Sequence, residues 1–388
     1  MGKPGGLTAL QDCQRQQFAY HKDVTPRASD FSLPLQQTGR THVRLNGRKL
    51  IYFGGCDYFR LSRHPKVISA IEEGLREFGL NPAASRFTTG NHIIYEALED
   101  ALRAFFVTDS ATLASTGYAT NLIVAQALHG EFTHALIDLR AHQSLQDSAA
   151  FLGCPVISFA HRDPESVRSI LRKLRRPRLL LLTDGLFSHD GALAPLQDYL
   201  SILPEDSCLL IDDAHGAGTL GKHGRGTCEL LRVHSERIIQ TISLSKAFGT
   251  FGGAILGSEP LRKKMIARSR LLQGNTPLPL PLANASLCSL KILKSEPPLR
   301  QRLQSNVQSL RKKLGKLAQS HPAAPVFPIY TQSSRDRQNL KEKLLEAQIH
   351  PPEIAYGTGE PYFRFAISSE HRPAQIATLA EILRTAAR

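Results

Sequence analysis

Two acidic residues and a histidine follow a short apolar run in the segment CLLIDDAHGAG. Asp212 and Asp213 stand at the end of this predicted strand, and His215 follows Asp212 by three residues. Ligands of wound α/β sheets bind at the carboxyl ends of strands. A carboxylate there can pair with a protonated ring nitrogen, and the histidine can reach a second polar atom of the same ring. Taken alone, the motif is equally compatible with Asp212 capping the turn that follows.

A lysine occupies a comparable place in IIQTISLSKAFGTFGGAIL. The predicted strand leads through Ser243 to Lys246 and into a turn that contains Gly249, Gly252 and Gly253. Desolvation in such a setting makes a lysine a nucleophilic amine. Hydroxyl side chains and free backbone N–H groups nearby suit a phosphate. The alternative, an exposed lysine in a surface loop, gives no reason for the glycines and hydroxyls around it.

The third polar segment is LASTGYATN, where a predicted strand ends and a helix begins at Thr116, Gly117 and Tyr118. The N-terminus of a helix favours an anion, because its first backbone N–H groups lack partners within the helix. This segment is therefore a second candidate phosphate site, although it is a weak signal without the other two.

Seven short apolar runs predict the sheet that must position these segments. They cover residues 111–115, 134–139, 155–159, 178–184, 208–213, 238–243 and 251–256. Runs that are apolar on both faces are typical of a sheet covered on both sides. Between two of the runs, Asp163 and Pro164 predict the start of an amphipathic helix. The alternation predicts an α/β fold with a mainly parallel, wound sheet.

Smaller elements flank this sheet. Asn46-Gly47 between two alternating runs predicts a β-hairpin, and helical spacing recurs over residues 66–79 and 96–106. Further elements are expected near the C-terminus: a long helix over 303–317, strands at 326–331 and 362–368, and a helix from about residue 373. We therefore expect an N-terminal segment (1–60), a large α/β domain (61–260) and a small C-terminal α+β domain (261–388).

The bulk composition excludes several classes of protein. No apolar run is long enough to cross a bilayer and no secretory signal is evident, so we expect a cytoplasmic protein without a membrane span. The formal charge of +14 raises the question of nucleic acid or a polyanionic substrate, but the basic residues are scattered, which argues against nucleic acid. The six cysteines are far apart without a C-x-x-C pair, so we expect reduced thiols and no metal site: Cys13, Cys56, Cys154, Cys208, Cys228 and Cys288.

In their order and spacing, the three polar segments together resemble the α-oxoamine synthases, and the resemblance extends from about Tyr52 to the C-terminus. Members of this family are fold-type I enzymes that use pyridoxal 5'-phosphate to condense an amino acid with an acyl-CoA, with loss of CO2. The resemblance implies the fold-type I transferase fold, the same cofactor, and an amino acid and an acyl-CoA or acyl-carrier-protein as substrates.

The resemblance also implies a role for each matching residue. Lys246 would bind the cofactor as a Schiff base and later act as acid and base. Asp212 would keep the pyridine nitrogen protonated and His215 would hydrogen-bond to the phenolic oxygen, so that both tune the ring. His142 in RAHQSL matches a histidine that stacks on the ring, although alone it would be an ordinary polar residue. Ser188 in TDGLFSHDG matches a serine that contacts the cofactor.

Phosphate and substrate contacts follow in the same way. The phosphate-binding positions of the family correspond to Thr116, Gly117, Tyr118 and Ser243. Thr276 in QGNTPLP matches a threonine that reaches the phosphate of the neighbouring subunit, so a homodimer is expected. Arg364 in YFRFAISSEH matches the arginine that binds the amino-acid carboxylate, a role suited to a planar bidentate donor. The alternative for Arg364 is a surface arginine on a strand.

Within the family, Ser85-Arg86 and the sequence DAHG favour the branch that joins L-alanine to pimeloyl-CoA, or to its carrier-protein thioester, in biotin synthesis. Glycine C-acetyltransferase, serine palmitoyltransferase and 5-aminolevulinate synthase share much of the pattern. A different reaction of the same cofactor, transamination or retro-aldol cleavage, is an alternative because one fold hosts many chemistries. Another alternative is a non-catalytic partner subunit, but the presence of Lys246, Asp212 and His215 argues against it.

Two segments depart from the family pattern. Where the family usually reads N-D-Y-L-G-L, this chain reads CDYFRL, so Cys56 replaces an asparagine expected to bind the substrate carboxylate and Arg60 replaces a glycine. A thiol is a poor donor, so carboxylate binding would rest on Arg364, be shared by Arg60, or involve an unusual amino acid. After Thr276, Pro277 replaces a serine, which removes a hydroxyl and a backbone donor.

Overall fold

The computed structural model describes residues 32–355 and 360–386, so Cys13 and the first half of the predicted N-terminal segment lie outside it. A seven-stranded sheet has the order β4-β10-β9-β8-β7-β5-β6. The strands from β9 to β6 in this order are parallel, whereas β10 is antiparallel to both of its neighbours. The mainly parallel sheet is confirmed, with these strands: β4 (Ser110–Ala114), β5 (His134–Asp138), β6 (Val156–Phe159), β7 (Leu179–Asp184), β8 (Cys208–Asp212), β9 (Ile238–Ser243) and β10 (Gly253–Gly257).

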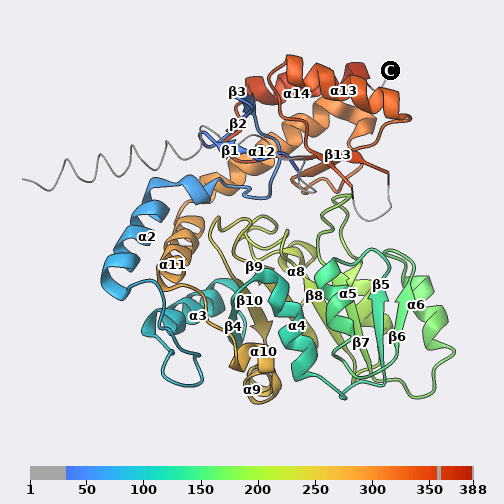
Figure 1. The fold of residues 1–388 in the computed structure, drawn as a ribbon. Coiled ribbons are helices and arrows are strands. Elements are labelled where there is room, and N and C mark those ends of the chain that lie inside the picture. Colours follow the sequence, from blue (N-terminus) through green and yellow to red (C-terminus); the bar gives the residue numbers. More distant parts are fainter. Residues whose placement is uncertain (1–31, 356–359, 387–388) are drawn as a thin grey trace, which may run out of the picture.

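The sheet is covered on both faces, as the apolar runs indicate (Figure 1). Alternate residues of β7 enter different cores: Leu180 and Leu182 pack with residues of α4 and α5, and Leu179 and Leu181 with residues of α6 and α7. Since each face buries its own row of leucines, the strand has no polar face until Thr183. The covering helices are α4 (Gly117–Ala127), α5 (Gln143–Ala149), α6 (Pro164–Leu171), α7 (Leu196–Ile202) and the short α8 (Thr227–Leu231).

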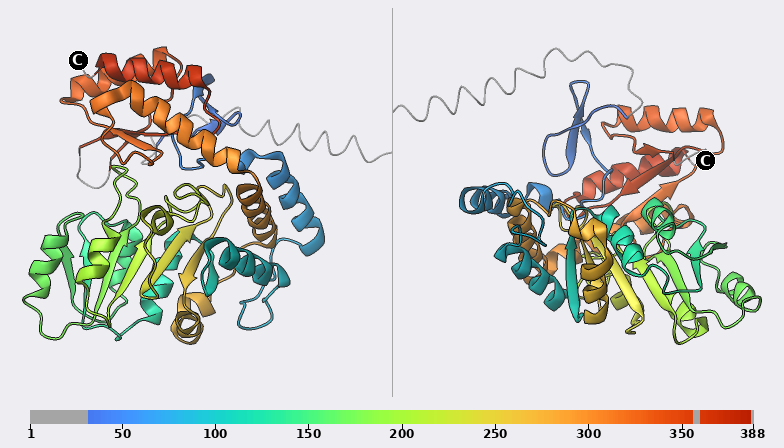
Figure 2. Two further views of the ribbon diagram at one scale, coloured as in Figure 1. Left: turned by 180° about the vertical axis from the view of Figure 1, so that it is seen from behind. Right: turned by 60° about the horizontal axis from the view of Figure 1, so that its bottom comes forward.

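A second group of helices lies beside the β4 edge of the sheet (Figure 2). Helix α11 packs on α2 and on α3, and α9 packs on α4. Gly74 lets α2 and α11 approach, because a Cβ there would lie 2.9 Å from the Cα of Pro281. The bounds of these helices are α2 (Pro65–Phe78), α3 (Ile93–Phe106), α9 (Glu259–Arg268), α10 (Arg270–Gln273) and α11 (Leu280–Ser295).

A smaller antiparallel sheet with the order β11-β13-β12 lies above the large one in Figure 1. Its strands are β11 (Val326–Ile329), β12 (Glu353–Ile354) and β13 (Tyr362–Ala366), and its helices are α12 (Pro297–Leu314), α13 (Ser334–Glu346) and α14 (Pro373–Ala386). The predicted apolar stripe from Leu303 is buried along α12. The helix nevertheless ends at Gly315, whose φ of 57° belongs to the left-handed region, and a 3-10 turn (η2, Gly315–Leu317) follows.

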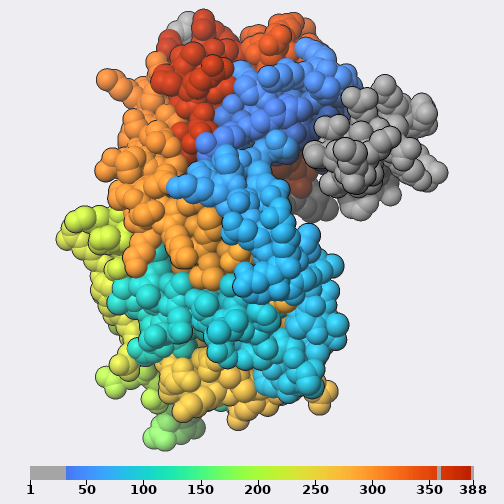
Figure 3. All heavy atoms as spheres, turned by 90° about the vertical axis from the view of Figure 1, so that its left-hand side faces the viewer, coloured from blue at the N-terminus to red at the C-terminus, as the bar shows by residue number. Residues whose placement is uncertain are grey.

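The N-terminal hairpin, in blue in Figure 3, lies beside the C-terminal part of the chain and belongs to a separate three-stranded sheet of order β1-β2-β3. Asn46 and Gly47 both have positive φ, which confirms the predicted turn between β2 (His42–Leu45) and β3 (Arg48–Ile51), with β1 (Gln36–Gln37) on the other side of β2. A 3-10 turn, η1 (Leu61–Arg63), then leads into α2. The boundaries predicted at residues 60 and 260 remain predictions, although α9 to α11 contact helices of the large sheet and α12 contacts α14. Within residues 32–355 and 360–386, no helix is both long and apolar enough to span a membrane.

His371 connects the N-terminal segment to the small sheet. Its ring is nearly fully buried and stacks on Phe53, with 4.2 Å between ring centroids. Nδ1 accepts a hydrogen bond from the Ser368 backbone N–H at 2.9 Å, and Nε2 donates to the carbonyl of Tyr52 at 3.0 Å. Burial, with the nearby charge of Arg60, lowers the pKa of His371 to about 3. The ring is therefore neutral in the folded protein at neutral pH.

This histidine should make the fold sensitive to mild acid. Between pH 6.5 and 3 the unfolded chain binds a proton at His371 that the folded chain excludes, so stability falls as the pH falls. Lowering the pH from 7 to 5.5 should cost about 1 kcal/mol of unfolding free energy through this residue. Urea unfolding at both pH values should show a smaller pH effect in His371→Gln than in the wild type. His234→Gln, at an exposed position, is the control, and equal pH effects in all three proteins would contradict this account.

Candidate active site

Polar side chains gather at the carboxyl edge of the large sheet. Asp184 and Asp212 end neighbouring parallel strands and face each other in register. Ser243 ends the next strand, and it pairs through Gly253 of β10 with Ala114, the last residue of β4. The parallel register therefore brings all three polar segments of the sequence to one edge.

The Asp212 carboxylate is buried and held by three donors. Its Oδ2 accepts from Asn121 Nδ2 at 2.7 Å and from Ser144 Oγ at 3.3 Å, and its Oδ1 accepts from the backbone N–H of Ala214 at 3.1 Å. Asn121 is fixed in turn, since its Oδ1 accepts from Thr241 at 2.8 Å. These bonds stabilise a charged carboxylate of fixed orientation, which is what a protonated ring nitrogen requires.

Asp184, which pairs with Asp212 in the register of β7 and β8, was not singled out from the sequence. Its Oδ2 accepts from the backbone N–H of His142 at 2.8 Å. Complete burial, and then the negative charge of Asp212, raise the pKa of Asp184 well above its ordinary value. Both effects favour the uncharged form of Asp184.

Two histidines of the site are neutral. Burial lowers the pKa of His142, and it lowers that of His215 further, where the charges of Lys246 and Arg364 act in the same direction. His142 caps α5, and its Nδ1 accepts from the backbone N–H of Ser144 at 3.2 Å. His215 Nδ1 is hydrogen-bonded to the hydroxyl of Tyr58 at 2.7 Å, so the orientation of its ring is fixed.

Lys246 lies half-buried in the turn after β9. Its charge acts on His142, His215 and Asp184, so its ammonium group lies within electrostatic range of the carboxylate pair. The turn depends on Gly249, whose φ is 62° and where a Cβ would lie 2.4 Å from the backbone nitrogen of Ser62. Only glycine fits this position, which explains why a glycine follows Lys246 here.

Gly117 and Ser243, two of the residues predicted to bind phosphate, come together where α4 meets the end of β9. A Cβ on Gly117 would lie 2.8 Å from the Cβ of Ser243, so glycine allows the helix N-terminus to approach this serine. Thr116 caps the helix by accepting from the backbone N–H of Ala119 at 3.1 Å. Tyr118 is more exposed; its hydroxyl donates to the Asp147 carboxylate and its ring stands edge-on to His142, with 6.1 Å between centroids.

Arg364 reaches the site from the small sheet. It lies on β13, and its Nη1 donates to the carbonyl of Ser188 at 3.5 Å, in the turn after β7. Its charge acts on Tyr58 and on His215, and the side chain of Cys56 also interacts with Tyr58. Arg364 and Cys56 thus both act on Tyr58, which is bonded to His215, and Ser188 contacts Arg364.

Arg60 binds the protein rather than a ligand. Its Nη2 donates to the carbonyls of Tyr52 at 3.1 Å and Gly54 at 3.3 Å, and its guanidinium lies over the Tyr52 ring. Its φ of 54° is in the left-handed region, where the glycine usual in the family is unstrained. The structure therefore gives no support to Arg60 as a substrate ligand.

Thr276 is the predicted site residue that stands apart. It is exposed and lies in the segment after α10, where Asn275 Nδ2 donates to Ser115 Oγ at 2.6 Å. This segment lies next to Thr116, on the side of the sheet edge where phosphate is predicted to bind. Among the interactions of the described residues, none links it to the group around His215. A threonine that contacts the cofactor of a partner subunit has to be exposed in the single chain.

Residues 48–383 match the family model of aminotransferase class I and II. The chain belongs to this family. Among its relatives, the 8-amino-7-oxononanoate synthase of Thioalkalivibrio sulfidiphilus is 36% identical over 87% of this chain and 88% of its own length. A putative 8-amino-7-oxononanoate synthase of Desulforudis audaxviator is 34% identical over 88% and 91%. These relatives confirm the resemblance to the α-oxoamine synthases.

Solved structures of the family share the fold. Serine palmitoyltransferase of Sphingomonas wittichii superposes with a TM-score of 0.86 at 24% identity and covers 99% of this chain and 98% of its own. An 8-amino-7-oxononanoate synthase from Francisella tularensis gives a TM-score of 0.75 at 26% identity, over 87% and 98% of the two chains. The predicted fold-type I architecture is confirmed.

Tyr58 offers a test of the site that the sequence motifs did not suggest. Tyr58→Phe leaves the buried Nδ1 of His215 without its partner, which costs about 1–3 kcal/mol. We expect kcat/KM to fall roughly 10- to 100-fold, with an altered pH dependence of the absorption spectrum of the predicted cofactor.

Tyr95→Phe is the matched control, since this equally buried hydroxyl donates to the Leu278 carbonyl at 2.6 Å and not to His215. Both variants lose one buried hydrogen bond, so both should lose similar stability. An equal loss of activity in the two variants, with unchanged spectra, would show that Tyr58 has only a structural role.

Proposed function

We propose that this chain catalyses the decarboxylating condensation of L-alanine with pimeloyl-CoA, or with its carrier-protein thioester, as in biotin synthesis. Its membership of the α-oxoamine synthases makes it a pyridoxal-phosphate-dependent acyltransferase. The observation that carries the proposal is that the charges of Lys246 and Arg364 both act on the buried His215, which follows the buried carboxylate of Asp212 by three residues. The choice of these two substrates is supported by the names of the relatives at 33–36% identity.

The residues of the site fit pyridoxal 5'-phosphate. When bound, the cofactor supplies an electron sink for a carbanion at the amino-acid Cα. Asp212, oriented by Asn121, would hold a proton on the ring nitrogen, and the helix N-terminus at Gly117 with Ser243 would bind the phosphate. His142, neutral in its buried position, is suited to lie against an aromatic ring because it brings no competing charge.

Different residues would then carry out different parts of the reaction. The Lys246 amine would take the proton from the amino-acid Cα and return a proton to the product after CO2 has left. Arg364 would bind the carboxylate that is lost, so that the bond to be broken has a fixed orientation. Attack of the Cα on the thioester carbonyl releases the thiol of coenzyme A or of the carrier, and the α-oxoamine remains.

Two features bear on substrate choice. Arg86, one of the pair that favoured the biotin branch, binds both oxygens of Glu99 and lies over the Tyr95 ring, so it holds the segment between α2 and α3. Arg86 therefore favours the biotin branch as a residue that stabilises the structure, and not as a residue that binds substrate. We also propose a homodimer, because the exposed Thr276 can reach a partner's phosphate only across such an interface.

The proposal is tested by titrating the cofactor-loaded protein with L-alanine, glycine and L-serine while its visible absorption is recorded. We expect L-alanine to shift the cofactor band saturably, and subsequent pimeloyl thioester to release CO2 and free thiol. If only L-serine or only glycine shifts the cofactor band saturably, that amino acid is the substrate in place of L-alanine. Transfer of the amino group without consumption of the thioester would contradict the proposed acyltransferase activity.

Arg364→Lys should change the Michaelis constants of the two substrates differently. Lysine keeps the charge but loses the bidentate fork, so we expect KM for the amino acid to rise roughly 10-fold or more. The KM for the thioester should change little. Arg302→Lys, at an exposed position on α12, is the control. A rise in both Michaelis constants would show that Arg364 holds the site together and does not select the carboxylate.

Cys56→Asn tests the departure from the family at the same site. If Arg364 carries the carboxylate because the thiol is a poor donor, a restored asparagine should lower the amino-acid KM a few-fold. An unchanged KM would show that position 56 does not contact the carboxylate, and the reliance on Arg364 would then need another explanation.

A further inference from the structure

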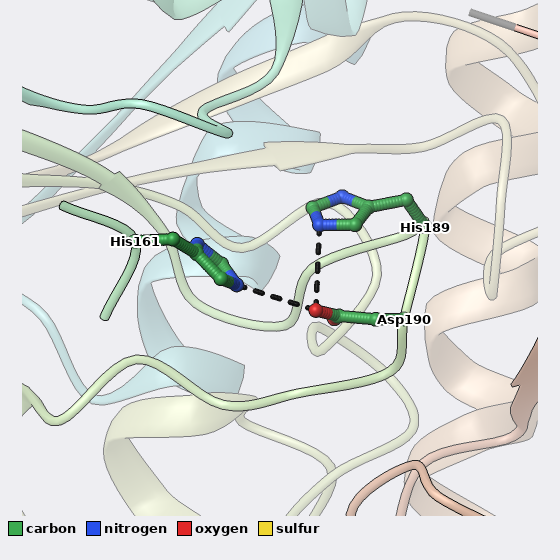
Figure 4. A group of neighbouring side chains, drawn as sticks. All are labelled: His161, His189 and Asp190. Carbon is green, nitrogen blue, oxygen red and sulfur yellow. Dashed lines mark hydrogen bonds and ion pairs between the residues drawn. The ribbon is translucent and has the colours of Figure 1, made fainter. Parts of the chain in front are cut away.

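Three side chains next to the candidate active site point toward one another (Figure 4). His161 follows β6, and His189 and Asp190 lie in the turn after β7. His161 Nε2 is 3.2 Å from Asp190 Oδ2, and His189 Nε2 is 3.4 Å from the same oxygen. One nitrogen of each histidine and this oxygen all lie within 4.8 Å of one another.

The groups behind this cluster fix its orientation. His161 Nδ1 is bonded at 2.9 Å to Asp138 Oδ1, and the fully buried Asp138 also accepts backbone N–H groups of Arg140 and Arg162. Asp190 Oδ1 accepts from the Ala192 N–H at 2.8 Å, which leaves Oδ2 turned to the histidines. A histidine ring whose second nitrogen is bonded to a carboxylate is the usual arrangement of a metal-binding histidine.

Hydrogen bonds within the protein do not satisfy the cluster. When both ring nitrogens of His161 carry a proton, they donate to Asp138 and to Asp190, which accounts for those two carboxylates. His189 Nε2, however, is a buried nitrogen that makes no hydrogen bond within residues 32–355 and 360–386, although it faces Asp190. Arg140 approaches Asp190 only at 3.6 Å, and its side chain is half exposed. The unsatisfied nitrogen therefore points to a ligand that binds the three atoms together.

We propose that His161, His189 and Asp190 bind a divalent cation of the zinc type, with water completing the coordination. Two imidazole nitrogens and one carboxylate oxygen, with one open position, are a known ligand set for Zn²⁺. Bonds of about 2.0–2.1 Å in a tetrahedron imply edges of roughly 3.3–3.4 Å. The two nitrogen–oxygen separations are close to this value, so only the two histidine rings have to approach each other.

The charge of the cluster also favours a divalent cation. Asp138 and Asp190 carry two negative charges when both histidines are neutral ligands, and the half-exposed Arg140, 3.6 Å from Asp190, offsets part of this charge. A divalent cation would take the place of the proton that His161 otherwise holds between the two carboxylates. The cation would also fix the turn that carries Ser188, whose carbonyl accepts from Arg364. This site is distinct from the one that binds the cofactor, and the inference does not depend on the identity of the amino acid or the thioester.

The test is calorimetric titration of ZnCl2 into the cofactor-loaded protein after chelator dialysis, with metal content measured after equilibrium dialysis. The wild type should bind one Zn²⁺ per chain saturably. His189→Leu removes a ligand without touching the catalytic groups, and we expect its affinity to fall about 100-fold or more. His134→Leu, a histidine of β5 outside the cluster, is the matched control and should bind as the wild type does.

The absorption spectrum of the cofactor and a thermal melt of each metal-free variant show whether it is folded and loaded. Asp138→Asn gives a second measure, since it leaves all three ligands in place and should weaken binding about 10- to 100-fold. Absence of saturable binding to the wild type would overturn the proposal. So would equal affinity of the wild type and His189→Leu, because the metal would then lie on the cysteines or the cofactor phosphate.

Discussion

The proposed role of Asp212 needs a carboxylate of fixed orientation at a buried position, and much of the surrounding structure meets this requirement. An isolated buried carboxylate would be strongly disfavoured, so its oxygens need donors and its neighbours must not share its charge. Asn121 and Ser144 donate from two helices that cover the sheet, and the pKa of Asp184 is raised so that this carboxyl does not compete. The register of β7 and β8, which sets the two acids side by side, therefore also determines where the charge lies.

The sequence was sufficient for the sheet and for the polar groups at its edge. Runs that are apolar on both faces identify buried strands, and the parallel order brings the chain after each of them to one edge, so Asp212, Lys246 and Thr116 could be brought together without coordinates. Asp184 could have been found by the same rule, since it ends the run RLLLLTD. Local patterns were sufficient here because each residue is placed by its own strand.

Residues placed by distant parts of the chain could not be found in this way. Tyr58 reaches His215 across 157 residues and Asn121 reaches Asp212 across 91, and neither has a local signal. For Arg60, the sequence left open a share in carboxylate binding, and the structure adds a left-handed φ and bonds to two backbone carbonyls, which favour a structural role. Backbone conformation and long-range partners decide these roles, and a sequence pattern contains neither.

The turn after β7 combines both kinds of constraint. Its start is fixed by the sheet, because the Gly185 N–H donates to the carbonyl of Asp212 at 2.8 Å. Its far end is fixed by side chains, since Asp190 faces two histidines and accepts the Ala192 N–H. Ser188 lies between these anchors and receives Arg364 from the small sheet. The position of the arginine thus depends on the cluster around Asp190 as well as on β13, and any group bound there would act on the substrate side of the site through this turn.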